Sequence, residues 1–178
     1  MYERILVPTD GSDVAEAAVD HALDIAKRYD AEVHALFVAD TDAIAYGLGA
    51  DEVDRIREGK FEEMDELHEH AEEATSYVVD LATEDGLVVH QRHAGGKPHQ
   101  VIADYADEED IDLVVMGSHG RAGVRRALLG SVTERTLRST DVPVLVVDYR
   151  GIENDRSARG ADHAAGERQA QNESARRE

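Results

Sequence analysis

The chain has 178 residues, of which 39 are acidic and 19 are basic, and its formal net charge is -20. It has no cysteine, which excludes disulfides, thiol nucleophiles and cysteine-ligated metals. Residues 1–8 lack a basic segment followed by a long apolar one, and no apolar stretch approaches the roughly 18 residues of a membrane span. We therefore expect a cytoplasmic protein without membrane contact, and no nucleic-acid partner, because most of the surface would repel a polyanion.

Acidic residues dominate this chain, whereas lysine occurs only three times. Such a composition is typical of proteins from a high-salt cytoplasm, where salt screens the self-repulsion of the surface. Residues 117–139 are an exception, because they carry five arginines and the single acid Glu134. Arginine pairs well with phosphate oxygens, so this segment predicts a site for a phosphorylated ligand.

The N-terminal third begins as a strand followed by a helix. Residues 3–8 are a short apolar run that predicts a buried strand, and residues 9–12 have the composition of a turn. Apolar residues spaced three and four apart then predict a helix up to Tyr29, with Ser12 or Asp13 as its N-cap.

The middle of the chain continues this alternation. Residues 33–39 predict a second strand, and residues 40–60 predict a loop with at most a short helix that could cover a site. A long amphipathic helix is expected over residues 61–86, its other face rich in acids. Residues 87–94 predict a third strand, and residues 95–96, both glycine, predict a turn.

The remaining elements follow the same order. Pro98 suits the first position of a third helix, and residues 111–116 predict a fourth strand. A glycine-punctuated loop follows over residues 117–130, then a helix over residues 132–139 and a fifth strand over residues 142–147.

Nearly continuous apolar strands that alternate with helices predict a doubly wound, Rossmann-like α/β fold, a parallel sheet with helices on both faces. Ligands of such sheets bind at the C-terminal ends of the strands, where the strand order reverses. The polar loops over residues 9–12 and 117–130 both leave the sheet at that end. We expect one domain over residues 1–149, and a polar tail over residues 150–178 that has too few apolar side chains to fold alone.

The loop after the fourth strand is suited to an anion. Gly117, Gly120 and Gly130 allow the backbone to approach a ligand closely, because they have no Cβ. Ser131 with Glu134 three residues later is a capping-box pattern, which predicts a helix N-terminus whose free N–H groups attract phosphate. The Ser131 hydroxyl can cap that helix or bind a phosphate oxygen, and both roles stay open.

The same glycines carry a resemblance to a known family. Gly117, Gly120, Gly130 and Ser131 have the G-x2-G-x9-G-[S/T] spacing of ATP-binding universal stress proteins. The opening ILVPTDGS and the closing PVLVV also match that family, so the resemblance covers roughly residues 2–148. The acidic, tail-bearing form of the chain further resembles haloarchaeal members.

The resemblance implies a five-stranded sheet of order 3-2-1-4-5 with ATP, or another adenine nucleotide, lying across strands one and four. It also implies a homodimer joined through the last strand, residues 143–147. Carried over by position, it implies contacts to adenine and ribose on one side and to phosphates on the other. The adenine and ribose side consists of Pro8, Thr9, Asp10, Val38, Met116 and Gly117. The phosphate side consists of His119, Gly120, Gly130, Ser131, Val132 and Thr133.

Asp10 is the one carboxylate that we place in this crevice, and three roles compete for it. It can accept hydrogen bonds from ribose hydroxyls, or bind a divalent cation such as Mg2+ that also touches phosphate oxygens. It can also simply cap the first helix. His119 has two interpretations as well, a phosphate contact or a solvated loop histidine.

Two functions fit these expectations, and a third interpretation is an oligomeric scaffold that binds no nucleotide. The first is a dimeric stress-response regulator whose nucleotide occupancy is read by an unidentified protein partner. The alternative is a weak Mg2+-dependent ATPase or phosphotransferase in the same pocket. The chain has no Walker-type phosphate loop and no evident base beside the predicted phosphates, so we assign no catalytic residue and expect slow hydrolysis at most.

The other histidines could suggest metal sites. His68 and His70 are two residues apart on a predicted helix, and their spacing places them on different faces. The group of His90, His93 and His99 likewise gives no recognised ligand set. We therefore expect these histidines to be solvated.

Overall fold

The computed structural model describes residues 1–44, 49–58, 60, 64–120 and 129–148. The predicted tail and the arginines of residues 121–128 lie outside this part of the chain. The helices and strands are, in chain order, β1 (Arg4–Pro8), α1 (Asp13–Tyr29), β2 (Glu32–Asp40), α2 (Thr41–Ile44), α3 (Ala50–Arg57), α4 (Asp65–Glu84), β3 (Val89–Gly96), α5 (Pro98–Glu108), β4 (Leu113–Gly117), α6 (Ser131–Ser139) and β5 (Val144–Val147).

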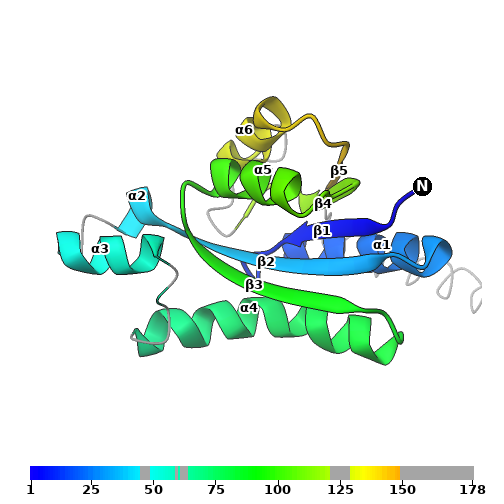
Figure 1. Ribbon diagram of the computed structural model, residues 1–178, viewed down its shortest axis with the longest axis horizontal. Coiled ribbons are helices and arrows are strands. Elements are labelled where there is room, and N and C mark those ends of the chain that lie inside the picture. The colour runs from blue at the N-terminus through cyan, green and yellow to red at the C-terminus, as the bar shows by residue number, and fades with distance from the viewer. Residues whose placement is uncertain (45–48, 59, 61–63, 121–128, 149–178) are drawn as a thin grey trace, which may run out of the picture.

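The five strands form one sheet of order β3-β2-β1-β4-β5, and every neighbouring pair is parallel. Helices α1 and α4 cover one face, and α5 and α6 cover the other (Figure 1). The predicted doubly wound fold and the implied strand order are therefore confirmed.

Alternation along the strands divides the core between the two faces. On β1, Ile5 and Val7 pack with the α1 and α4 side, whereas Leu6 packs with the α5 side. All three side chains are fully buried, as expected for a central strand covered on both faces. Different helices thus cover the two faces of the sheet, and the ends of the strands are left available for a binding site.

Helix α1 has the boundaries that the local pattern predicts. Ser12 is its N-cap, and the Ser12 hydroxyl accepts a hydrogen bond from the Ala15 N–H at 3.3 Å. The helix ends at Tyr29, because the left-handed backbone of its C-cap Asp30 (φ 55) stops further helical hydrogen bonding. Its buried face is rich in alanine, which lets the helix axis lie close to the sheet.

Residues 40–60 differ from the predicted loop, because they contain the two helices α2 and α3. Glu52 stabilises the start of α3 by accepting a hydrogen bond from the Gly49 N–H at 2.9 Å. Ile56 of α3 is fully buried against Phe37 of β2, and this tertiary contact orders a segment of weak periodicity.

The glycine pair after the third strand also differs from its prediction, because Gly95 and Gly96 belong to β3 and do not form a turn. A Cβ on Gly95 would overlap the backbone carbonyl of Ile56. Glycine is needed there for the close approach of α3, a requirement that local turn propensity does not reveal.

None of the helices in the described part of the chain is long and apolar enough to cross a bilayer.

Candidate functional site

The loops that follow β1 and β4 lie in contact. The two strands are direct neighbours, with Ile5 paired to Leu113 and Leu6 to Val114. At their C-terminal ends, a Cβ on Gly120 would lie 2.5 Å from Asp10 Oδ2. The two polar loops therefore meet at the C-terminal edge of the sheet, where this fold class binds its ligands.

The loop after β1 is a set of tight turns built by its own side chains. The Gly11 N–H donates to Thr9 Oγ1 at 3.1 Å, and the Ser12 N–H donates to Asp10 Oδ1 at 3.1 Å. Gly11 has φ 70, a backbone conformation that favours glycine. Because Ser12 caps α1, the cap role considered for Asp10 is wrong; its carboxylate stabilises the turn that precedes the cap.

Ser118 holds the loop after β4 in place. Its N–H donates to the Val147 carbonyl at 2.7 Å, and its own carbonyl accepts from the Gly130 N–H at 2.8 Å. Its hydroxyl donates to Asp148 Oδ1 at 3.0 Å. Sequence reasoning missed Ser118 and Asp148, although Ser118 directly follows the motif residue Gly117, because the contacts that link Ser118 to Gly130, Val147 and Asp148 span 12 or more residues.

The Ser118 hydroxyl also determines whether Nδ1 of the His119 ring carries a proton. A hydroxyl has one proton, and Ser118 gives it to the Asp148 carboxylate. His119 Nδ1, 2.9 Å from Ser118 Oγ, must therefore donate to that oxygen. His119 Nε2 can then donate to a phosphate oxygen only when the ring is cationic.

Helix α6 begins at Ser131 with Gly130 as its N-cap, so the predicted Ser131 capping box is wrong. The start of the helix is set by tertiary contacts: Thr133 Oγ1 donates to the Gly117 carbonyl at 2.9 Å, and Gly130 lies against His119. Gly130 has no side chain with which to cap the first turn. The N-terminus of α6 thus combines close backbone packing with an absent side-chain cap, which suits an anion.

The apolar residues predicted to border the base come from three elements. Pro8 is buried at the end of β1, and Met116 is buried on β4. Val38 of β2 is partly buried and packs against the cluster that contains Met116. Val132 of α6, which belongs to the predicted phosphate side, packs against the same cluster. The structure therefore brings both sides of the predicted site to the same end of the sheet.

The sequence profile of the universal stress protein family matches residues 1–148. The chain belongs to this family. It is 42% identical over 148 residues to Universal stress protein MJ0531 of Methanocaldococcus jannaschii, which covers 83% of this chain and 82% of that protein.

Solved universal stress proteins have the same fold. UspA from Lactobacillus plantarum superposes with a TM-score of 0.68 at 30% identity, over 82% of this chain and 97% of that one. A universal stress protein solved in complex with cAMP superposes with a TM-score of 0.57 at 29% identity, again over 82% of this chain and 97% of the other.

This universal stress protein also has a cavity of about 360 Å3 at the opposite end of the sheet, where β2 and β3 begin. Glu32, His34, His90 and Tyr105 contribute to its lining. His34 is buried, and its Nδ1 is 2.9 Å from the Tyr105 hydroxyl. Burial is the main cause that lowers the pKa of His34, and the neighbouring His90 lowers it further. The cavity is therefore separate from the predicted nucleotide site.

The expectation of solvated histidines is wrong for His68, His70, His93 and His99, which are all partly buried, whereas His90 is exposed. His70 packs against the Phe37 ring, with 5.2 Å between ring centroids. Burial is the main cause that lowers the pKa of His93, and the nearby Glu72 opposes it. The sequence does not reveal this burial, because it results from the packing of α4 on β3.

Proposed function

We propose that this chain is an adenine-nucleotide-binding regulatory protein, with ATP as its predicted ligand. The observation that carries the proposal is the contact of Gly120 with Asp10, which joins the loops after β1 and β4 at the strand ends. The family supports it, and so does the related structure, which was solved with cAMP.

In this proposal the two sides of the crevice recognise different parts of the nucleotide. Pro8, Val38 and Met116 provide the apolar surface for adenine, and Asp10 accepts from ribose hydroxyls or binds Mg2+ beside the phosphates. The backbone N–H groups at the start of α6 stabilise phosphate charge, and the side chains of Ser131 and His119 add donors.

Such a site gives a direct route to regulation. Bound phosphate would contact both Gly120, in the loop after β4, and the start of α6, and helix α2 follows directly from the end of β2. We infer that nucleotide occupancy sets the conformation of this surface, and that an unidentified protein partner reads it.

Calorimetric titration of the full chain with ATP, AMP and cAMP tests the proposal. We expect binding of one adenine nucleotide per chain. Gly120→Ala should weaken it roughly tenfold, ~1.4 kcal/mol, because the added Cβ must displace the Asp10 carboxylate. Gly49→Ala is the matched control, because the nearest contact of its Cβ is 3.7 Å away, at the Glu52 carboxylate.

Two results separate the remaining functions. No heat with any adenine nucleotide, together with no nucleotide in protein purified from cells, would overturn nucleotide binding. Steady release of phosphate from ATP, dependent on Mg2+ and lost in Asp10→Asn, would favour the ATPase alternative over the regulator.

A further inference from the structure

His68, Glu72 and His93 bring three ligand atoms together where α4 packs on the edge strand β3. One nitrogen from each histidine and one carboxylate oxygen lie within 4.8 Å of one another. His68 and Glu72 are four residues apart, so they project from one face of α4, and His93 reaches them from β3. The nucleotide function proposed above assigns no role to these residues.

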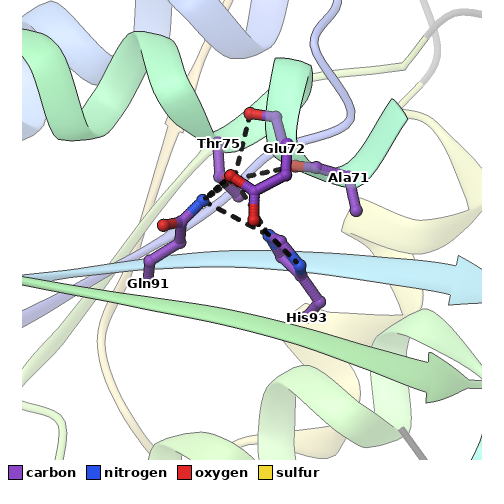
Figure 2. A network of polar contacts seen from close by, with 5 residues as sticks. All are labelled: Ala71, Glu72, Thr75, Gln91 and His93. Atoms are coloured by element: carbon purple, nitrogen blue, oxygen red, sulfur yellow. Dashed lines mark hydrogen bonds and ion pairs between the residues drawn. The ribbon is translucent and has the colours of Figure 1, made fainter. Parts of the chain in front are cut away.

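The hydrogen bonds of Thr75 determine which His93 nitrogen carries the proton (Figure 2). The Thr75 hydroxyl donates its one proton to the Ala71 carbonyl at 2.7 Å, since a carbonyl can only accept. Its contact with His93 Nε2 at 3.1 Å therefore requires that Nε2 donates. In the neutral ring, His93 Nδ1 then carries a lone pair.

That lone pair faces a carboxylate. Gln91 donates to Thr75 Oγ1 at 2.7 Å and to Glu72 Oε2 at 3.0 Å, and Figure 2 shows these side chains converging. The other oxygen, Glu72 Oε1, lies 3.9 Å from His93 Nδ1. Two acceptors that face each other are favourable only with a proton or a cation between them.

His68 adds a second nitrogen to this cluster. Its ring centroid is 6.2 Å from that of His93. Among the described residues, no hydrogen-bond partner reaches His68 Nδ1, which is buried. A buried polar nitrogen without a partner costs free energy, and ligation of a cation would offset that cost.

We propose that His68, Glu72 and His93 bind a zinc ion. Two imidazole nitrogens and one carboxylate oxygen are a ligand set typical of zinc, and they leave a fourth position for water. Tetrahedral ligands at ordinary zinc bond lengths lie about 3.3 Å apart. The cluster must therefore contract around the ion, because Glu72 Oε1 and His93 Nδ1 are 3.9 Å apart and the three ligand atoms lie within 4.8 Å of one another. The Glu72 side chain is 49% exposed and can move to do so.

The rest of the network acts as an outer shell for this ion. Thr75 orients His93 through Nε2, and Gln91 orients Glu72 through Oε2. Such hydrogen bonds hold a metal ligand in the required tautomer and rotamer. The bound ion would join α4 to β3 at the outer edge of the sheet.

The other histidine cluster of the described residues, Glu32 with His34 and His90, provides the control. There His90 Nε2 already lies 3.0 Å from Glu32 Oε2, and the Arg4 side chain lines the same cavity. The pair of Glu32 and His90 is already hydrogen-bonded and lies near a positive guanidinium. It is therefore less suited to bind a cation than Glu72 and His93, whose two acceptor atoms face each other.

Zinc binding to the untagged full chain tests the proposal, with excess Mg2+ present to occupy surface carboxylates. We expect one zinc per chain, a raised Tm, and with Co2+ the strong visible bands of a four-coordinate site. His93→Ala and His68→Ala should each weaken zinc binding by at least about 100-fold, and Thr75→Val by roughly 10- to 100-fold. His90→Ala should leave it unchanged.

Several results would overturn the zinc site. These are zinc binding no tighter than that of Mg2+, binding retained in His68→Ala, or binding lost in His90→Ala. Loss in Asp10→Asn would instead locate the ion at the nucleotide crevice. ATP titration of His68→Ala keeps the two proposals apart, because this variant should lose zinc and retain nucleotide.

Discussion

Thr133 and Thr136 lie three residues apart on α6, and both are buried. The Thr133 hydroxyl donates to the Gly117 carbonyl and so joins the helix to the end of β4. Among the described residues, no hydrogen-bond partner reaches Thr136 Oγ1. The two hydroxyls should therefore contribute to stability with opposite sign.

We expect Thr133→Val to lower the free energy of unfolding by about 1–3 kcal/mol, because it leaves the Gly117 carbonyl without this donor. Thr136→Val should leave that energy unchanged or raise it by up to ~1 kcal/mol, since it removes a buried hydroxyl that has no hydrogen-bond partner among the described residues. Urea unfolding of both variants measures the difference. Equal losses in the two would contradict the assignment.

Helix α4 is the element whose charge is most uneven. It has seven acidic residues and no lysine or arginine. Asp65 and Glu66 in its first turn are favourable next to the helix N-terminus, whereas Glu84 at its C-terminal end is not. Its acidic exposed face adds to the electrostatic self-repulsion of a molecule of net charge -20.

We expect Glu84→Lys to raise the free energy of unfolding by about 0.3–1 kcal/mol at low salt, because it places a cation at the C-terminal end of α4. The new lysine would also lie four residues after Asp80. Glu66→Lys, the control at the other end, should lower stability. Thermal unfolding at low and high salt measures both, and an effect that does not shrink with salt would argue against an electrostatic cause.

At the scale of the whole molecule, the sheet has two unlike edges. Edge strand β3 carries polar side chains such as His90 and Gln91, whereas edge strand β5 consists of VLVV, and Leu145 is 36% exposed. An apolar edge risks uncontrolled pairing unless another chain or element covers it. We therefore keep the homodimer through residues 143–147 as a proposal.

Val146→Asp should produce monomers in sedimentation velocity experiments, because a charge in β5 opposes burial between two copies. Val88→Asp is the matched control: Val88 is 55% exposed beside the start of β3, and a charge there should leave the dimer intact. Dimers that persist in Val146→Asp would show that another surface joins the chains, and a monomeric parent protein would overturn the dimer itself.

Local patterns within the sequence were sufficient for the alternation of strands and helices, for a cap of α1 at Ser12 or Asp13, and for the two loops that meet at the strand ends. These features depend on residues close in the chain, whose spacing reports which side chains are buried. The contact between Asp10 and Gly120 follows from the same logic, because parallel strands end at one edge.

Only the tertiary structure decided where packing between distant segments overrides local preference. Gly95 lies inside β3 because Ile56 packs against it. Helix α6 begins at Ser131 because the Gly130 N–H donates a hydrogen bond to the Ser118 carbonyl. The tertiary structure also brings His68 close to His93, although the two residues are 25 positions apart in the sequence and lie on different elements. Such contacts depend on the relative positions of elements in space, and periodicity along one segment carries no information about them.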